Sequence, residues 1–107
     1  MKLTKKQALE LHRQMWKDMM NKLGDSPSLA ERINFKKWWC NEHFPDKGID
    51  CYCFLCEYTK QYGEFCCDHC PIKWDDNYDD DSCGGMGVNY ECSPISTILA
   101  LPEREGV

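Results

Sequence analysis

Two C-x2-C pairs, Cys53/Cys56 and Cys67/Cys70, constrain this chain more than any other feature of its sequence. They lie in a 24-residue stretch, 51–74, that holds six of the nine cysteines, and ten residues separate the two pairs. A C-x2-C segment is typical of a tight turn whose main-chain amides point at the sulfurs, and two such turns supply four thiolates to a tetrahedral zinc ion. The sequence therefore predicts one structural zinc, bound by Cys53, Cys56, Cys67 and Cys70.

Three further cysteines leave the ligand set open. Cys51, Cys66 or Cys83 can each replace one of the four assigned ligands. An iron site can use the same two pairs, although Glu57 and Pro71 occupy positions where electron-transfer sites carry glycine. Zinc is therefore the favoured metal. Its four thiolates would close the coordination sphere, and no catalytic motif accompanies the pairs, so we expect no enzymatic activity.

Length and composition favour a single domain, 1–107, whose cysteines are reduced. A core built from 107 residues gives marginal stability, which a structural metal would raise. The odd number of cysteines, their paired spacing and the lack of a signal-peptide pattern disfavour a secreted disulfide scaffold. No segment has membrane-spanning length. We therefore expect a cytoplasmic protein that does not contact a membrane.

Residues 4–23 predict an amphipathic helix with apolar side chains at a 3.6-residue period. Thr4 and Gln7 have the spacing of a capping box, and Gly24 can supply the left-handed residue that ends the helix. His12 falls near the centre of the apolar face. It is either a core histidine bonded to a carbonyl or a metal-binding or catalytic residue, and the first interpretation is favoured.

A second helix is predicted from Pro27 to about Trp39, with Ser26 as its cap. Leu29 and Ile33 mark one apolar stripe along it. Three aromatic residues of this helix lie outside that stripe: Phe35, Trp38 and Trp39. Because so much aromatic surface is costly to leave in water, we expect these three residues to form a partner-binding edge, for a host protein or a second copy of the chain.

Cys40 and His43 have C-x2-H spacing, which can begin a second metal site. The simpler interpretation makes Cys40 the end of a buried helix face and His43 a loop residue. Both interpretations are open at this stage.

The predicted fold is a small α-rich (α+β) single domain. Its two N-terminal helices, in residues 1–40, pack on a four-cysteine zinc-knuckle module at 51–74, which includes a short helix at 57–62. An acidic, glycine-rich loop with a short strand at its end follows at 75–92, and a short helix and tail complete the chain at 93–107. The net charge of −5 disfavours a general nucleic-acid-binding surface, although a local basic patch is compatible with it.

Four segments together resemble small cysteine-rich proteins encoded by bacteriophages and prophages of Firmicutes: QALELHRQMW, CFLCEY, CDHCPIKW and the terminal LPERE. The resemblance implies that the two C-x2-C pairs bind zinc. It also implies an accessory protein that acts in the host cytoplasm. Three cysteines are not explained by it: Cys51, Cys66 and Cys92.

Three classes of function follow from these features. The favoured one is a binding module that inhibits or redirects a host or anti-phage defence protein, because four Trp, five Tyr, four Phe and five Met suit an interface. The first alternative is a zinc protein that binds or mimics nucleic acid. The second is an oligomeric protein that sequesters a signalling nucleotide.

Overall fold

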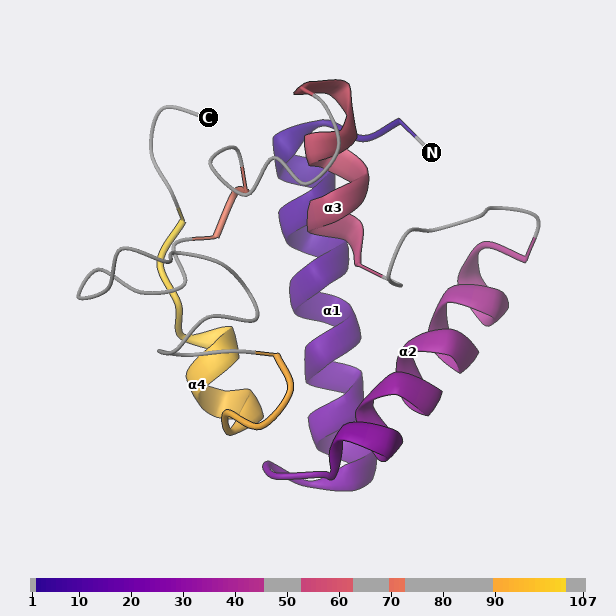
Figure 1. Cartoon of the computed structure of the whole chain (residues 1–107), viewed down its shortest axis with the longest axis vertical. Helices are drawn as coiled ribbons and strands as arrows, with labels where there is room; N and C mark the ends of the chain where they lie inside the picture. The colour runs from indigo at the N-terminus through magenta and orange to yellow at the C-terminus, as the bar shows by residue number, and fades with distance from the viewer. Residues whose placement is uncertain (1, 46–52, 63–69, 73–89, 104–107) are drawn as a thin grey trace.

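The computed structural model describes residues 2–45, 53–62, 70–72 and 90–103, and in these parts the chain is mainly helical. Figure 1 shows α1 at the centre of the molecule, with the other helices arranged around it. The elements are α1 (Lys5–Leu23), α2 (Leu29–His43), α3 (Phe54–Thr59), the 3-10 helix η2 (Lys60–Tyr62) and α4 (Ile95–Leu99). The prediction of a small α-rich domain is confirmed at this level.

The first helix begins and ends as the sequence predicts. Thr4 is its N-cap, and Thr4 and Gln7 form the reciprocal capping box. Gly24 ends the helix with a φ of 87°, a conformation that residues with a Cβ rarely adopt. The face that α1 buries consists of Ala8, Leu9, His12, Met15, Trp16 and Met19.

The second helix begins two residues later than predicted and ends four residues later. Ser28, not Ser26, is its N-cap, because Ser28 and Glu31 form a capping box that satisfies two main-chain amides reciprocally. At the other end the helix continues to His43, where the N–H of Phe44 donates to the carbonyl of Cys40. The predicted start at Ser26 and Pro27 is therefore wrong.

The buried face of α2 also differs from the predicted stripe. Leu29 and Ile33 are 40% and 38% exposed, so these two residues of the predicted stripe lie at the edge of the buried face and not within it. The buried face includes two cations, Arg32 and Lys36, beside three apolar residues, Phe35, Trp39 and Cys40.

Arg32 is tolerated in the interior because main-chain carbonyls surround its guanidinium group. Its Nε donates to the carbonyl of Pro27 at 3.0 Å, and its Nη1 donates to the carbonyls of Tyr90 and Ser93 at 3.1 and 2.7 Å. A buried charge is stabilised only when its hydrogen-bonding capacity is met in this way. Arg32 therefore fastens the segment before α4 onto α2.

The remaining helices pack against α1. Figure 1 shows α3 beside the N-terminal half of α1, and α4 on the side of α1 away from α2. The main-chain amides of Ile95 and Ser96 donate to the carbonyl and the carboxylate of Asp25, each at 2.7 Å, which anchors the start of α4 to the α1–α2 connection.

The C-terminal part differs from the prediction in two places. Tyr90 to Cys92 form a turn, not the predicted strand, of which residues 88 and 89 lie outside the described part of the chain. Ile72 pairs in an isolated antiparallel bridge with Glu103, whose carboxylate lies 3.0 Å from the ammonium of Lys5.

No helix in the described parts of the chain is both long enough and apolar enough to cross a membrane.

Candidate functional site

The first cysteine pair lies at the start of α3. Cys53 is the N-cap, with an extended backbone, and its carbonyl accepts the first helical hydrogen bond from the N–H of Glu57 at 3.2 Å. Cys56 follows three residues later, so both cysteines belong to the first turn of the helix. The helix starts at Phe54, three residues before the prediction, because the C-x2-C turn itself forms its first turn.

The surroundings of Cys53 favour its thiolate. A hydrogen bond with the side chain of Cys56 is the largest cause that lowers the pKa of Cys53, to about 6. Burial opposes this change, whereas the charge of Lys36 and the main-chain amides of Cys56 and Leu55 add to it. A thiolate that accepts hydrogen bonds from amides is the form in which cysteine binds zinc. The first pair therefore fits half of a thiolate site.

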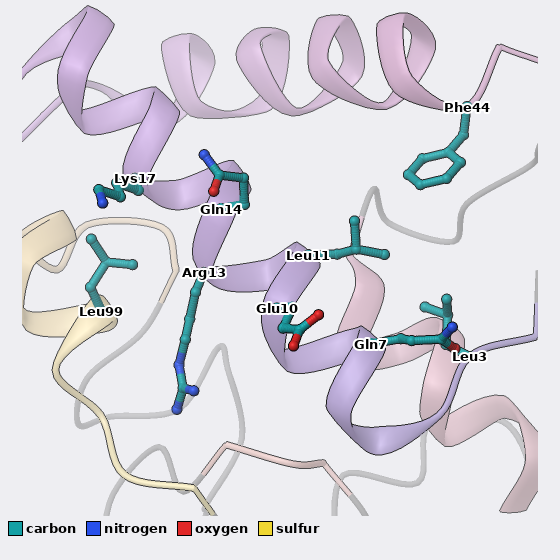
Figure 2. Close-up of a pocket in the computed structure, with 9 residues that line it drawn as sticks. All are labelled: Leu3, Gln7, Glu10, Leu11, Arg13, Gln14, Lys17, Phe44 and Leu99. Carbon is teal, nitrogen blue, oxygen red and sulfur yellow. The ribbon is translucent and has the colours of Figure 1, made fainter.

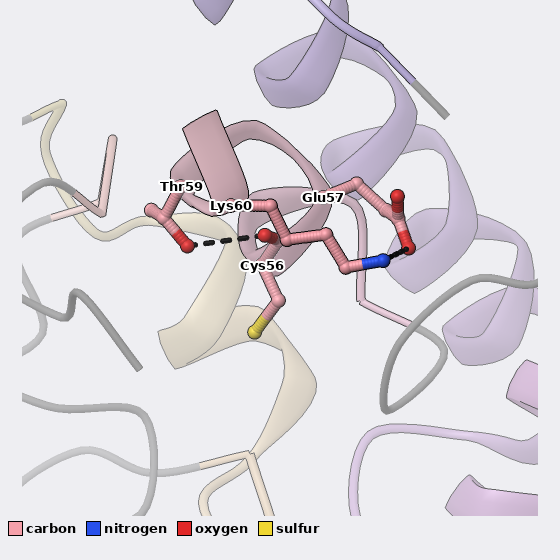
Figure 3. Close-up of polar contacts among 4 residues, drawn as sticks. All are labelled: Cys56, Glu57, Thr59 and Lys60. Carbon is pink, nitrogen blue, oxygen red and sulfur yellow. Dashed lines mark hydrogen bonds and ion pairs between the residues drawn. The ribbon is translucent and has the colours of Figure 1, made fainter. Parts of the chain in front are cut away.

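Polar contacts hold α3 in place around the pair. The carboxylate of Glu57 is buried and accepts from the ammonium of Lys60 at 3.2 Å. The hydroxyl of Thr59 donates to the carbonyl of Cys56 at 3.1 Å. Figure 3 shows the Cys56 sulfur and the Glu57 carboxylate pointing in different directions from α3, so the Glu57–Lys60 ion pair does not involve the sulfur.

The second pair is described only in part. Cys70 is half-buried and packs against the hydrophobic core, while Cys67 lies outside the described residues, as do Cys51, Cys66 and Cys83. Among the described residues, no three or more metal-ligating side chains come together in a group that could hold a metal ion. The structure thus brings Cys53 and Cys56 together and leaves the other half of the site undefined.

Cys40 and His43 have different surroundings in the structure. Burial is the main cause that raises the pKa of Cys40, to about 11, so this thiol is neutral at physiological pH. The ring of His43 stacks on Trp39 at a centroid distance of 3.7 Å, and its Nδ1 lies 2.9 Å from the Trp39 carbonyl. Cys40 belongs to the buried face of α2, as the simpler interpretation of the sequence has it, whereas His43 is the last residue of α2 and not a loop residue.

His12 lies in the core, edge-on to Trp16 at a centroid distance of 6.4 Å. The pKa of His12 is lowered to about 3, mainly by burial and to a smaller extent by the charges of Lys36 and Arg13. The ring is therefore neutral at physiological pH, which matches a core histidine better than a proton donor.

The three aromatic residues of α2 have different environments. Phe35 and Trp39 belong to the buried core, and the indole N–H of Trp39 donates to Asp18 Oδ2 at 2.8 Å. Trp38 is 49% exposed, with the ammonium of Lys22 5.5 Å from its ring centroid. Of the predicted partner-binding edge, Trp38 is thus the residue that solvent reaches.

Sequence reasoning missed the burial of one cation on α2. Lys36 is only 6% exposed, and its ammonium lies over the rings of Trp16 and Tyr90, at 5.6 and 4.8 Å from their centroids. A lysine within an amphipathic helix pattern is ordinarily predicted to face solvent. The available sequence signal was its i, i+4 spacing from Arg32 and Cys40, which places all three on one side of a helix.

An open recess of about 940 Å³ follows the exposed side of α1. Figure 2 shows Leu11 and Phe44 on one side of the helix and Arg13 and Leu99 on the other. The polar residues around the recess include one anion, two cations and two amides: Glu10, Arg13, Lys17, Gln7 and Gln14. This mixture does not favour one class of ligand.

Comparison of the chain with protein-family models, with curated proteins and with solved structures gave no significant match.

Proposed function

We propose that this protein is a zinc-stabilised binding module that presents Trp38 to a partner protein. The observation that carries the proposal is the exposure of this indole on a rigid helix. Tryptophan is among the residues that contribute most to protein interfaces, and leaving its apolar surface in water is unfavourable.

The position of Trp38 is fixed before any partner binds. Its ring lies against Phe35, with 5.5 Å between the centroids, and Lys22 of α1 covers part of it. Because Phe35 is anchored in the core, the indole loses little freedom on binding, which lowers the entropic cost of association.

The other exposed apolar residues of α2 belong to a different surface. Ile33 is five positions from Trp38, which corresponds to about 140° around the helix at 3.6 residues per turn. Leu29 lies beside Ile33, on the opposite flank of the buried face. The proposed interface therefore centres on Trp38 and the neighbouring surface of α1, and it does not include the Leu29–Ile33 flank.

Zinc has a structural role in this proposal. Cys53 and Cys56 supply the first two ligands, and Cys67 and Cys70 supply the others. When bound, the ion would join the start of α3 to the segment before Ile72 and so add to the stability of a small core.

The resemblance to phage-encoded proteins supports a partner in the bacterial cytoplasm. A host protein or an anti-phage defence protein is the proposed target, which the module inhibits or redirects.

The test compares Trp38→Ala with Lys37→Ala, a neighbouring exposed position on α2. Each tagged protein is expressed in a phage-infected Firmicutes host, and the co-purified proteins are quantified by mass spectrometry. A specific partner should be retained by the wild type and by Lys37→Ala, and reduced at least about tenfold by Trp38→Ala. Equal retention by Trp38→Ala, with unchanged circular dichroism, would contradict the proposal.

A further inference from the structure

The exposed side of α1 carries a row of charged residues in which cations predominate. The row consists of Lys6, Glu10, Arg13 and Lys17, all of which are exposed to solvent. With about 100° of rotation and about 1.5 Å of rise per residue, the four positions fall within about 60° of the helix circumference and span about 16 Å. Three cations and one anion give the row a net charge of +2, whereas the whole chain has −5.

The three cations of the row form no salt bridge with any residue in the described parts of the chain. The salt bridges between described residues lie elsewhere, and they join Lys5 to Glu103 and Lys60 to Glu57. The positive charges of the row are therefore compensated by water and by Glu10 alone among the described residues, and an external anion can reach them.

The open recess beside α1 borders two of these cations, Arg13 and Lys17. Figure 2 shows the Arg13 side chain extended away from α1, on the same side of the helix as Leu99. The lining of the recess has mixed character, but the row continues beyond it to Lys6, which is not part of the lining. A ligand that contacts the whole row must therefore be elongated and negatively charged along its length.

The phosphate backbone of a nucleic acid matches this row better than an acidic protein does. Duplex DNA carries one negative charge per about 1.7 Å of its axis, so a row about 16 Å long faces several phosphates whatever its register. An acidic protein would need carboxylates placed to match rises of about 10.5 Å from Lys6 to Arg13 and about 6 Å from Arg13 to Lys17.

We propose that the row of Lys6, Glu10, Arg13 and Lys17 is a contact surface for the phosphate backbone of double-stranded nucleic acid. Phosphate contacts carry no sequence information, so binding is sequence-independent and weakens as the salt concentration rises. Glu10 repels phosphate and limits the affinity. This surface requires neither the zinc site nor Trp38, so it stands or falls separately from the proposed binding module.

The test measures fluorescence anisotropy of a labelled DNA duplex of about 20 base pairs. At low salt the wild type should bind two unrelated sequences equally, with a Kd of about 10⁻⁴ M or tighter. Arg13→Gln and Lys17→Gln should each weaken binding by about threefold or more and reduce the salt dependence by about one phosphate contact. Lys37→Gln makes the same change at an exposed position of α2 and should leave binding nearly unchanged.

Glu10→Gln provides a variant that should bind the duplex more tightly than the wild type, a gain that loss of folding cannot produce. Equal or weaker binding by Glu10→Gln would overturn the inference, as would a wild type that does not bind the duplex at low salt. Equal losses in Arg13→Gln and Lys37→Gln would overturn it as well, because the row would then have no special role.

A competition experiment separates nucleic acid from an acidic protein as the ligand. Poly-aspartate with the same total charge as the duplex should displace the labelled DNA less effectively than unlabelled duplex does, because its carboxylates lack the regular spacing of the phosphates. Displacement by poly-aspartate at equal or lower concentration would overturn the inference in favour of an acidic protein.

Discussion

The indole N–H of Trp39 donates to Asp18 Oδ2 at 2.8 Å, and this bond ties α2 to α1 within the core. The other carboxylate oxygen of Asp18 accepts from Gln14 at 2.8 Å, which holds the carboxylate in position on α1. The neighbouring Trp38 points to solvent. Adjacent tryptophans therefore have separate roles, one in the core and one on the surface.

Stability should distinguish these two tryptophans. Trp39→Phe removes the N–H and leaves a half-buried carboxylate oxygen without its donor, so it should lower the free energy of unfolding by about 1–3 kcal/mol. Trp38→Phe should change it by less than about 0.5 kcal/mol, as is usual for surface positions. Urea unfolding of both variants measures the difference. Equal effects would show that Trp39 does not have the core role assigned to it.

Arg32 should be necessary for the attachment of the 90–93 segment. Arg32→Met removes all three carbonyl contacts, including those to Tyr90 and Ser93, and we expect a loss of about 3 kcal/mol or more. Hydrogen exchange at residues 90–93 should accelerate more than exchange in the middle of α1. A uniform change in exchange across the chain would contradict a local clamp.

His12 should make the protein less stable in acid. Its pKa is about 3 in the folded chain and about 6.5 when exposed, so below pH 6.5 the unfolded state takes up a proton that the folded state excludes. This contribution to stability is complete above pH 6.5 and is lost as the pH falls toward 3. Its upper bound is about 5 kcal/mol at 1.36 kcal/mol per pH unit.

His12→Gln should flatten the pH dependence of unfolding between pH 6.5 and 4. The measurement is urea unfolding of metal-free protein at several pH values. An unchanged profile in His12→Gln would contradict the buried neutral histidine.

The first helix could be predicted because everything that defines it is local. Thr4, Gln7 and Gly24 set its ends, and the period of its apolar residues sets its buried face. The start of α2 was misplaced because Ser26 and Ser28 are both plausible caps in sequence, and the pairing of Ser28 with Glu31 decides between them.

The buried face of α2 could not be predicted from its own sequence. Arg32 is stabilised inside by carbonyls 58 and 61 positions away along the chain, and Lys36 lies over the rings of Trp16 and Tyr90. A one-dimensional pattern places both cations in solvent, because their partners are distant in sequence. The proximity of Cys53 and Cys56, in contrast, could be predicted from their spacing alone.

Native mass spectrometry of protein purified under reducing conditions tests the zinc site most directly. The wild-type chain should carry one zinc, and Cys53→Ser and Cys56→Ser should each lose it, as should the equivalent changes at Cys67 and Cys70. Cys92→Ser, at an exposed position at the end of the Tyr90 turn, is the matched control and should keep the ion. A wild-type chain without metal, or zinc retained by both Cys53→Ser and Cys56→Ser, would contradict the account.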